Sequence, residues 1–148
     1  MSILALDIAT KTGWCCGEYG GAWDFSVKRD ESKDTRLLRF KAQLIETCIL
    51  MKPSLVVFER LSGRHVNSII VQAEMHGAMK VTLAEYGFNY RAFSASEIKK
   101  FATGKGNAGK PQMIQACIDK LNITPIDDNH ADAIWLHELA SDGLKYLG

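Results

Sequence analysis

The stretch SILALDIATKTG, residues 2–13, decides the fold class, because it joins a short apolar run to a polar turn with one acid at the junction. Residues 2–8 have the length and composition of a buried strand, and the polar residues after them predict a turn. A carboxylate is costly to bury unless it is paired or binds a cation, so Asp7 is a candidate functional residue. The simpler alternative is that Asp7 only helps to form the turn.

A second strand pattern also ends in an acid. Residues 55–58 (LVVF) form a continuous apolar run, as expected for a strand that is buried on both faces, and Glu59 follows directly. If the two strands are neighbours in a sheet, Asp7 and Glu59 meet near the same edge.

The remaining patterns complete an α/β fold. Strands are predicted over residues 13–19, 22–27 and 88–93, with Gly20 and Gly21 as the hairpin turn between the first two. Helices are predicted over 34–51, 66–86, 111–121 and from residue 127 or 128 to 144, with a short helix that opens at a capping box of Ser94 and Glu97. We therefore expect a mixed five-stranded sheet, with three antiparallel and two parallel strands and helices on both faces, which is the RNase H-like architecture.

The composition is consistent with a single globular domain over residues 1–148. Hydrophobic residues make up 47% of the chain and charged residues 24%, which is enough to bury a core. No apolar run approaches the roughly 20 residues that span a bilayer, and the first residues lack the basic start of a signal peptide. We expect a cytoplasmic protein with no membrane partner.

The last predicted helix supplies further acids. Asp128 and Asp132 lie four residues apart and so share one face of a helix. Facing Asp7 and Glu59, they would form an oxygen-only site suited to Mg²⁺, with Mn²⁺ as a substitute. Two such ions about 3.5–4 Å apart would activate a water and stabilise the leaving oxygen in phosphodiester hydrolysis. The alternative role for the first acids of this helix is a plain helix cap.

Basic residues gather just before this acidic segment, which favours contact with a nucleic-acid backbone. Residues 91–110 contain five cations and one acid. Lys105 and Lys110 flank a glycine-rich loop whose backbone amides can also meet phosphate. Arg60 and Arg64, close to Glu59, would extend the same surface. The alternative interpretation of this charge pattern is a set of solvated surface side chains.

Taken in order, these segments resemble the successive motifs of the RuvC-type Holliday-junction resolvases. The four segments are LALDIATKTGW (residues 4–14), VVFERLSG (56–63), SASEIKKFATGKGNAGKPQM (94–113) and DDNHADAIWL (127–136). The third is the most specific, because its Lys-Lys pair, its Thr-Gly-x-Gly and its later Lys stand at the family's spacing. The resemblance covers nearly the whole chain.

The resemblance implies a metal-dependent endonuclease that acts as a homodimer on a four-way DNA junction and nicks two strands symmetrically. Asp7, Glu59 and Asp132 take the family's acidic positions. The phosphate contacts that it implies are Lys99, Lys100 and Lys110. Of these, Lys110 is expected nearest the scissile group.

Two positions depart from the family's pattern. The family has Asp or His three residues before the last acid, where this chain has Asn129. Asp128, from the adjacent helical position, is our candidate for the fourth metal ligand, and His130 is a weaker one. The family's aromatic residue shortly after the second acid, which wedges into the junction, has no counterpart in residues 61–64. This second departure concerns junction selectivity more than cleavage.

Two other functions stay open at this point. One is a nuclease of the same fold that acts on other branched DNA or on RNA. The other is a nucleic-acid-binding protein that has kept the fold and lost hydrolysis, and the intact acids Asp7, Glu59 and Asp132 argue against it. The family suggests a bacterial cell or a phage-infected host cell, and dimerisation through the long helix over residues 66–86.

Overall fold

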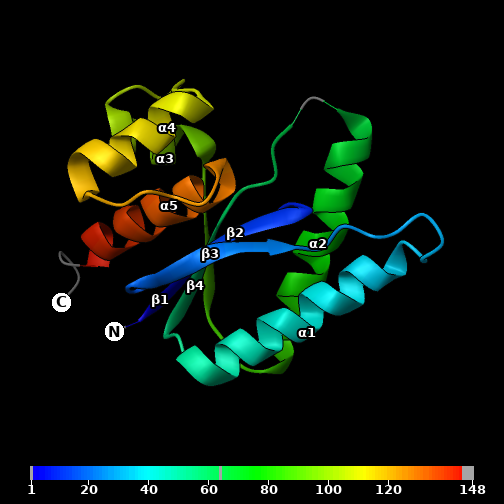
Figure 1. Ribbon diagram of the computed structural model, residues 1–148. Helices are drawn as coiled ribbons and strands as arrows, with labels where there is room; N and C mark the ends of the chain where they lie inside the picture. The colour runs from blue at the N-terminus through cyan, green and yellow to red at the C-terminus, as the bar shows by residue number, and fades with distance from the viewer. Residues whose placement is uncertain (1, 64, 145–148) are drawn as a thin grey trace.

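The computed structural model describes residues 2–63 and 65–144, and its centre is a five-stranded sheet (Figure 1). The strands are β1 (Ile3–Asp7), β2 (Lys11–Cys16), β3 (Tyr19–Asp24), β4 (Leu55–Glu59) and β5 (Tyr90–Phe93). They lie in the order β3-β2-β1-β4-β5. β1, β2 and β3 pair antiparallel, whereas β4 pairs parallel with both β1 and β5. The predicted mixed sheet, with β1 and β4 as neighbours, is confirmed.

Helices cover both faces of this sheet, as Figure 1 shows. α1 (Asp34–Met51) and α2 (Val66–Glu85) pack together on one face. α5 (Asp128–Leu144) lies on the other face, where it contacts β1, β2, β3 and β4. α3 (Ala95–Thr103) and α4 (Lys110–Ala116) pack against α5. None of the described helices is long and apolar enough to cross a bilayer.

The alternation of side chains along the central strands decides which layer each residue joins. Leu4 and Leu6 belong to the core on the α1 and α2 side, whereas Ala5 and Val57 belong to the core on the α5 side. Asp7 is two residues beyond Ala5, and Glu59 is two residues beyond Val57. Both acids therefore face the layer that contains α5.

The hairpin between β2 and β3 differs from the prediction. Its turn is formed by Gly17 and Glu18, with Gly17 at φ 61°, and Gly20 and Gly21 lie inside β3. A Cβ at Gly20 would lie 2.7 Å from Nε2 of His130 on α5, which is closer than side-chain carbons approach. The predicted turn was wrong because Gly20 meets a packing requirement and not a local one.

The helix predicted over residues 111–121 is more complex than expected. α4 ends at Ala116 and continues as a π-helical turn, η1 (Cys117–Leu121), which closes at Asn122 with φ 56°.

The capping box before α3 is confirmed. The Glu97 N–H donates to Ser94 Oγ (3.2 Å), and the Ser94 N–H donates to Glu97 Oε2 (2.8 Å). This box sets the start of α3 and so the direction in which its lysines extend.

α2 carries an apolar stripe on its solvent side. We call these residues the α2 stripe: Val66, Ile70, Ala73, Gly77, Val81 and Ala84. Val66, Ile70 and Val81 are 69%, 51% and 57% exposed, because Met75, Met79 and Leu83 form the face that packs on the core. A run of exposed apolar residues at helical spacing is typical of an interaction surface.

Candidate functional site

Two acids lie at the ends of adjacent parallel strands. The pairing of β1 with β4 runs as far as Leu6 with Phe58, and Asp7 and Glu59 each follow that last pair. Asp7 is 8% exposed, and Glu59 is half-buried. Parallel pairing therefore brings two carboxylates that are distant in sequence to one end of the sheet.

The first turn of α5 brings further acids to the same place. Asp127 caps the helix, because the His130 N–H donates to Asp127 Oδ1 (2.8 Å). Asp128 begins the helix, and Asp132 follows one turn later on the same side. The charges of both residues act on Asp7, so this turn lies over the strand ends. The sequence allowed either Asp127 or Asp128 to cap α5. Asp127 is the cap, so the Asp128 side chain is not used for that role.

We call Asp7, Glu59, Asp128 and Asp132 the acidic cluster. Burial, followed by the charges of Asp132 and Glu59, raises the pKa of Asp7 well above its usual value. Burial and the charges of Glu59 and Asp128 raise the pKa of Asp132 to about 7. Burial also raises the pKa of Glu59, against the opposing effect of Lys99. The charged forms of Asp7 and Asp132 are therefore disfavoured by burial and by the neighbouring acids.

Two lysines stand beside the acidic cluster. Lys110 is the first residue of α4, and its Nζ lies 3.2 Å from Asp128 Oδ2. Lys99 of α3 lowers the pKa of both Glu59 and Asp132, so its ammonium lies close to them. The helices that pack against α5 thus place positive charge next to the carboxylates, as a site for a phosphate group requires.

The donor set fits a hard divalent cation, although the carboxylates stand apart. Within residues 2–63 and 65–144, no three His, Cys, Asp or Glu side chains are already arranged around a common metal position. One of the four carboxylates, that of Asp128, is paired with Lys110. Four oxygen donors, of which Asp7 and Asp132 are disfavoured as anions by burial and by neighbouring acids, are a suitable set for a hard divalent cation, which would offset that cost.

His130, the weaker candidate for the fourth ligand, is engaged elsewhere. The Ile126 N–H donates to His130 Nδ1 (3.0 Å), and the His130 ring lies against Gly20 of β3. The carbonyl oxygen of Asn129 lies where a Cβ on Gly13 would be, at 1.9 Å from that position. His130 is thus committed to packing, and the first turn of α5 rests directly on the backbone of β2 and β3. Gly13 and Gly20 were not among the functional residues predicted from the sequence.

A sequence model of the crossover junction endodeoxyribonuclease RuvC matches residues 23–137. The chain belongs to the RuvC family. A RuvC from Synechococcus sp. strain CC9311 is 27% identical over 105 residues, which cover 70% of this chain and 66% of that protein. A RuvC from Gloeobacter violaceus is 31% identical over 96 residues, which cover 60% of this chain and 56% of that protein. The chain therefore spans less than two thirds of the length of these relatives.

The RuvC fold is also found among solved structures. T. thermophilus RuvC, solved in complex with a Holliday junction substrate, superposes with a TM-score of 0.80 at 18% sequence identity. The match covers 99% of this chain and 96% of that one. The expected RNase H-like architecture is thereby confirmed.

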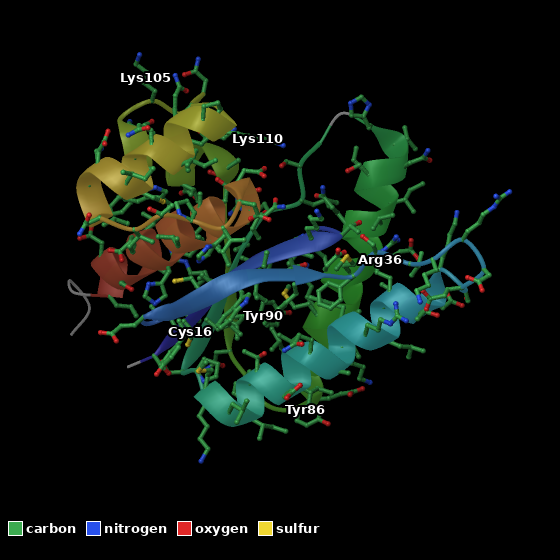
Figure 2. All side chains as sticks on the ribbon, in the orientation of Figure 1. Cys16, Arg36, Tyr86, Tyr90, Lys105 and Lys110 are labelled. Carbon is green, nitrogen blue, oxygen red and sulfur yellow. The ribbon has the colours of Figure 1, made fainter. Side chains whose placement is uncertain are left out.

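The other predicted basic residues that the structure describes line cavities or hollows of the surface. Lys100 lines a cavity with Arg91, Phe101 and the C-terminal half of α5. Lys105 lines a hollow between α3 and α4, and Figure 2 shows it at the outer end of this layer, with Lys110 nearer the sheet. Arg60 lines a cavity between α2 and β5. Arg64 lies outside the described residues.

Proposed function

We propose that this RuvC-family chain is a metal-dependent endodeoxyribonuclease that resolves four-way DNA junctions by symmetric nicks. The observation that carries the proposal is the juxtaposition of four carboxylates from β1, β4 and α5 with the ammonium groups of Lys99 and Lys110. The names of the curated relatives, and the junction bound to T. thermophilus RuvC, support DNA as the substrate.

Asp7, Glu59, Asp128 and Asp132 would hold Mg²⁺, or Mn²⁺ in its place. When bound, these ions supply an activated water and neutralise the charge that develops on the phosphate. The acids fix the place of reaction because they come from rigid strand ends and from one helix. The raised pKa values of Asp7 and Asp132 mean that cation binding displaces protons from these groups, and for Asp132, with a pKa of about 7, it does so near neutral pH.

Lys110 would bind a non-bridging oxygen of the scissile phosphate. Its side chain is 79% exposed, and an exposed ion pair contributes only about 0–1 kcal/mol, so the ammonium group can exchange Asp128 for a phosphate at low cost. Lys99, on the neighbouring helix, would hold the strand from the side of Glu59. Both contacts position the substrate by its backbone and carry no sequence preference.

The α2 stripe supports a homodimer. Its members recur along the helix at the spacing of a helix–helix seam, with exposed Val66, Ile70 and Val81 and the small residues Ala73 and Gly77 between them. A second copy of the chain would cover this stripe and set two acidic clusters side by side, as paired nicks across a symmetric junction require.

One observation favours a second candidate, a nuclease that acts on other branched DNA. Residues 61–64 contain no aromatic side chain, and Leu61, at 42% exposure, is the large apolar residue of this loop. A flexible aliphatic residue stacks on base pairs less well than an aromatic ring does. Selection for the junction centre would then be weaker than phosphodiester cleavage itself.

The test compares a labelled four-way junction, a duplex and an RNA–DNA hybrid, each with Mg²⁺ and with a chelator. Paired symmetric nicks that occur only in the junction and only with Mg²⁺ are the expected result. Equal cutting of all three substrates would favour the less selective nuclease. Binding without cutting, in Mg²⁺ and in Mn²⁺, would leave a nucleic-acid-binding protein and refute the proposal.

A further inference from the structure

The start of α5 is closed by two reciprocal hydrogen bonds. The His130 N–H donates to Asp127 Oδ1 (2.8 Å), and the Ile126 N–H donates to His130 Nδ1 (3.0 Å). His130 thus satisfies a backbone donor ahead of the helix while its own N–H is capped. Together the two bonds hold the turn that contains Asp128.

The same histidine ring sets how closely this turn approaches the sheet. His130 is 8% exposed, and its Nε2 lies 2.7 Å from the position of a Cβ on Gly20. The Asn129 carbonyl fills the corresponding space above Gly13. Because Gly13 of β2 and Gly20 of β3 have no side chains, the His130 side of α5 packs directly on these two strands.

The acids lie on the opposite side of the turn. A helix advances about 100° per residue, so Asp128 and Asp132, each two residues from His130, point about 160–200° away from it. A tilt of the start of α5 against these two glycines would therefore move both carboxylates relative to Asp7. We propose that His130 is a positioning residue, which orients Asp128 and Asp132 toward Asp7 and Glu59. The proposal rests on the function proposed above for this cluster.

α5 provides a matched control one heptad later. His137 lies on the same side of the helix and also accepts a backbone N–H, from Gly17 to Nε2 (3.2 Å). Its bond holds the middle of α5 to the β2–β3 turn, two helical turns beyond His130. Loss of this bond removes one histidine-to-backbone hydrogen bond, as His130→Leu does, without touching the acid-bearing turn.

The experiment measures Mn²⁺ affinity of the metal-free protein by calorimetry, together with kcat and KM on a labelled junction. Removal of a partner that orients a metal ligand typically weakens affinity by about 10–100-fold, so His130→Leu is expected to weaken Mn²⁺ binding by at least about 10-fold. It should lower kcat and leave KM nearly unchanged, because Lys99 and Lys110 are intact. His130→Asn, whose amide oxygen replaces Nδ1 as the acceptor, should recover most of the loss. His137→Leu should lower the melting temperature and leave Mn²⁺ affinity unchanged.

Three results would overturn the proposal. They are a folded His130→Leu variant with wild-type Mn²⁺ affinity, an equal loss of affinity in His137→Leu, and no recovery in His130→Asn. If His130→Leu does not fold, Gly20→Ala serves instead, since it displaces the ring without removing its acceptor, and unchanged Mn²⁺ affinity there would equally refute the proposal. Failure of the wild-type protein to bind Mn²⁺ or to cut DNA refutes the proposed function itself, which separates the two questions.

Discussion

Lys110 Nζ lies 3.2 Å from Asp128 Oδ2, so one carboxylate of the acidic cluster is shared with a lysine at the start of the neighbouring helix. The ammonium group neutralises a charge that a cation would otherwise neutralise. A phosphate that draws Lys110 away would leave Asp128 to the cation. The binding of DNA and the binding of metal are thus expected to support each other.

The first prediction concerns this ion pair. Lys110→Gln should lower kcat on a junction by about 100-fold, because under the proposed function it removes a charge that binds the scissile phosphate. The variant should unfold at the wild-type temperature, since an exposed pair contributes little stability. Lys33→Gln, which changes an exposed lysine just before α1 on the other face of the sheet, is the control and should cut nearly normally. Equal losses in the two variants would mean that Lys110 acts only through the overall positive charge.

The second prediction concerns the strand-end acids. Asp7→Asn should abolish cleavage, by more than the roughly 10–100-fold typical of residues that only orient a metal ligand, because it removes an anionic donor. Junction affinity in a gel-shift assay should stay near the wild-type value, since Asp7 contacts no phosphate. Asp30→Asn, in the exposed loop before α1, is the control. Retained cleavage by Asp7→Asn would refute the metal assignment.

The third prediction concerns pH. The pKa of Asp132 rises from 3.8 to about 7 on folding, and that of Asp7 also rises, so between these values the folded protein binds more protons than the unfolded chain. The free energy of unfolding of the metal-free protein should therefore fall as pH rises from about 4 to about 7. Asp132→Asn should reduce this fall, and in chelator at pH 7.5 it should melt above the wild type. Melting curves across this pH range, with and without Mn²⁺, provide the check, and a flat profile for the wild type would contradict the prediction.

The fourth prediction concerns the packing of α5 on Gly13 of β2. Gly13→Ala places a Cβ 1.9 Å from the Asn129 carbonyl oxygen, which is backbone and cannot rotate away. Overpacking of this kind destabilises by about 1–3 kcal/mol, so the variant should unfold at a clearly lower urea concentration. Gly143→Ala, near the end of α5, meets nothing within 4 Å and should be neutral or stabilise by up to about 1 kcal/mol. A neutral Gly13→Ala would mean that α5 can move away from β2 freely.

The fifth prediction concerns the α2 stripe. Val81 is 57% exposed, and Val81→Asp should convert a dimer into a monomer in light scattering, because it places a charge in the proposed seam. Leu38→Asp on α1, where the native side chain is 68% exposed, is the control and should leave the mass unchanged. A wild-type protein that is monomeric at all concentrations would refute the dimer.

The acid positions at the strand ends could be predicted from sequence because they follow from local patterns. An apolar run that ends in an acid, repeated on two parallel strands, places Asp7 and Glu59 together once the strands are neighbours. The hairpin turn predicted at Gly20 and Gly21 was wrong, because the reason for a glycine at position 20 is not local in sequence. That reason is His130, which lies far away in sequence and meets Gly20 only after α5 has docked.

Lys99 and Lys100 show the same limit of prediction from sequence. Lys99 and Lys100 are adjacent in sequence, yet Lys99 acts on Glu59 whereas Lys100 lines a cavity on another side of α3. Which of them faces the acids depends on the rotation of α3 about its axis, and that rotation is set by packing against α5. Similarly, a run of two aspartates does not reveal which one caps the helix until the hydrogen bond to Asp127 is known.

The acidic cluster draws its members from the first strand and from the last described helix of the chain. During synthesis on the ribosome, Asp7 and Glu59 emerge well before α5, and Asp128 and Asp132 join them only after that helix is released. Under the proposed function, a nascent chain that has paired its strands would lack two of the four acids, so cutting would begin only after α5 has been released.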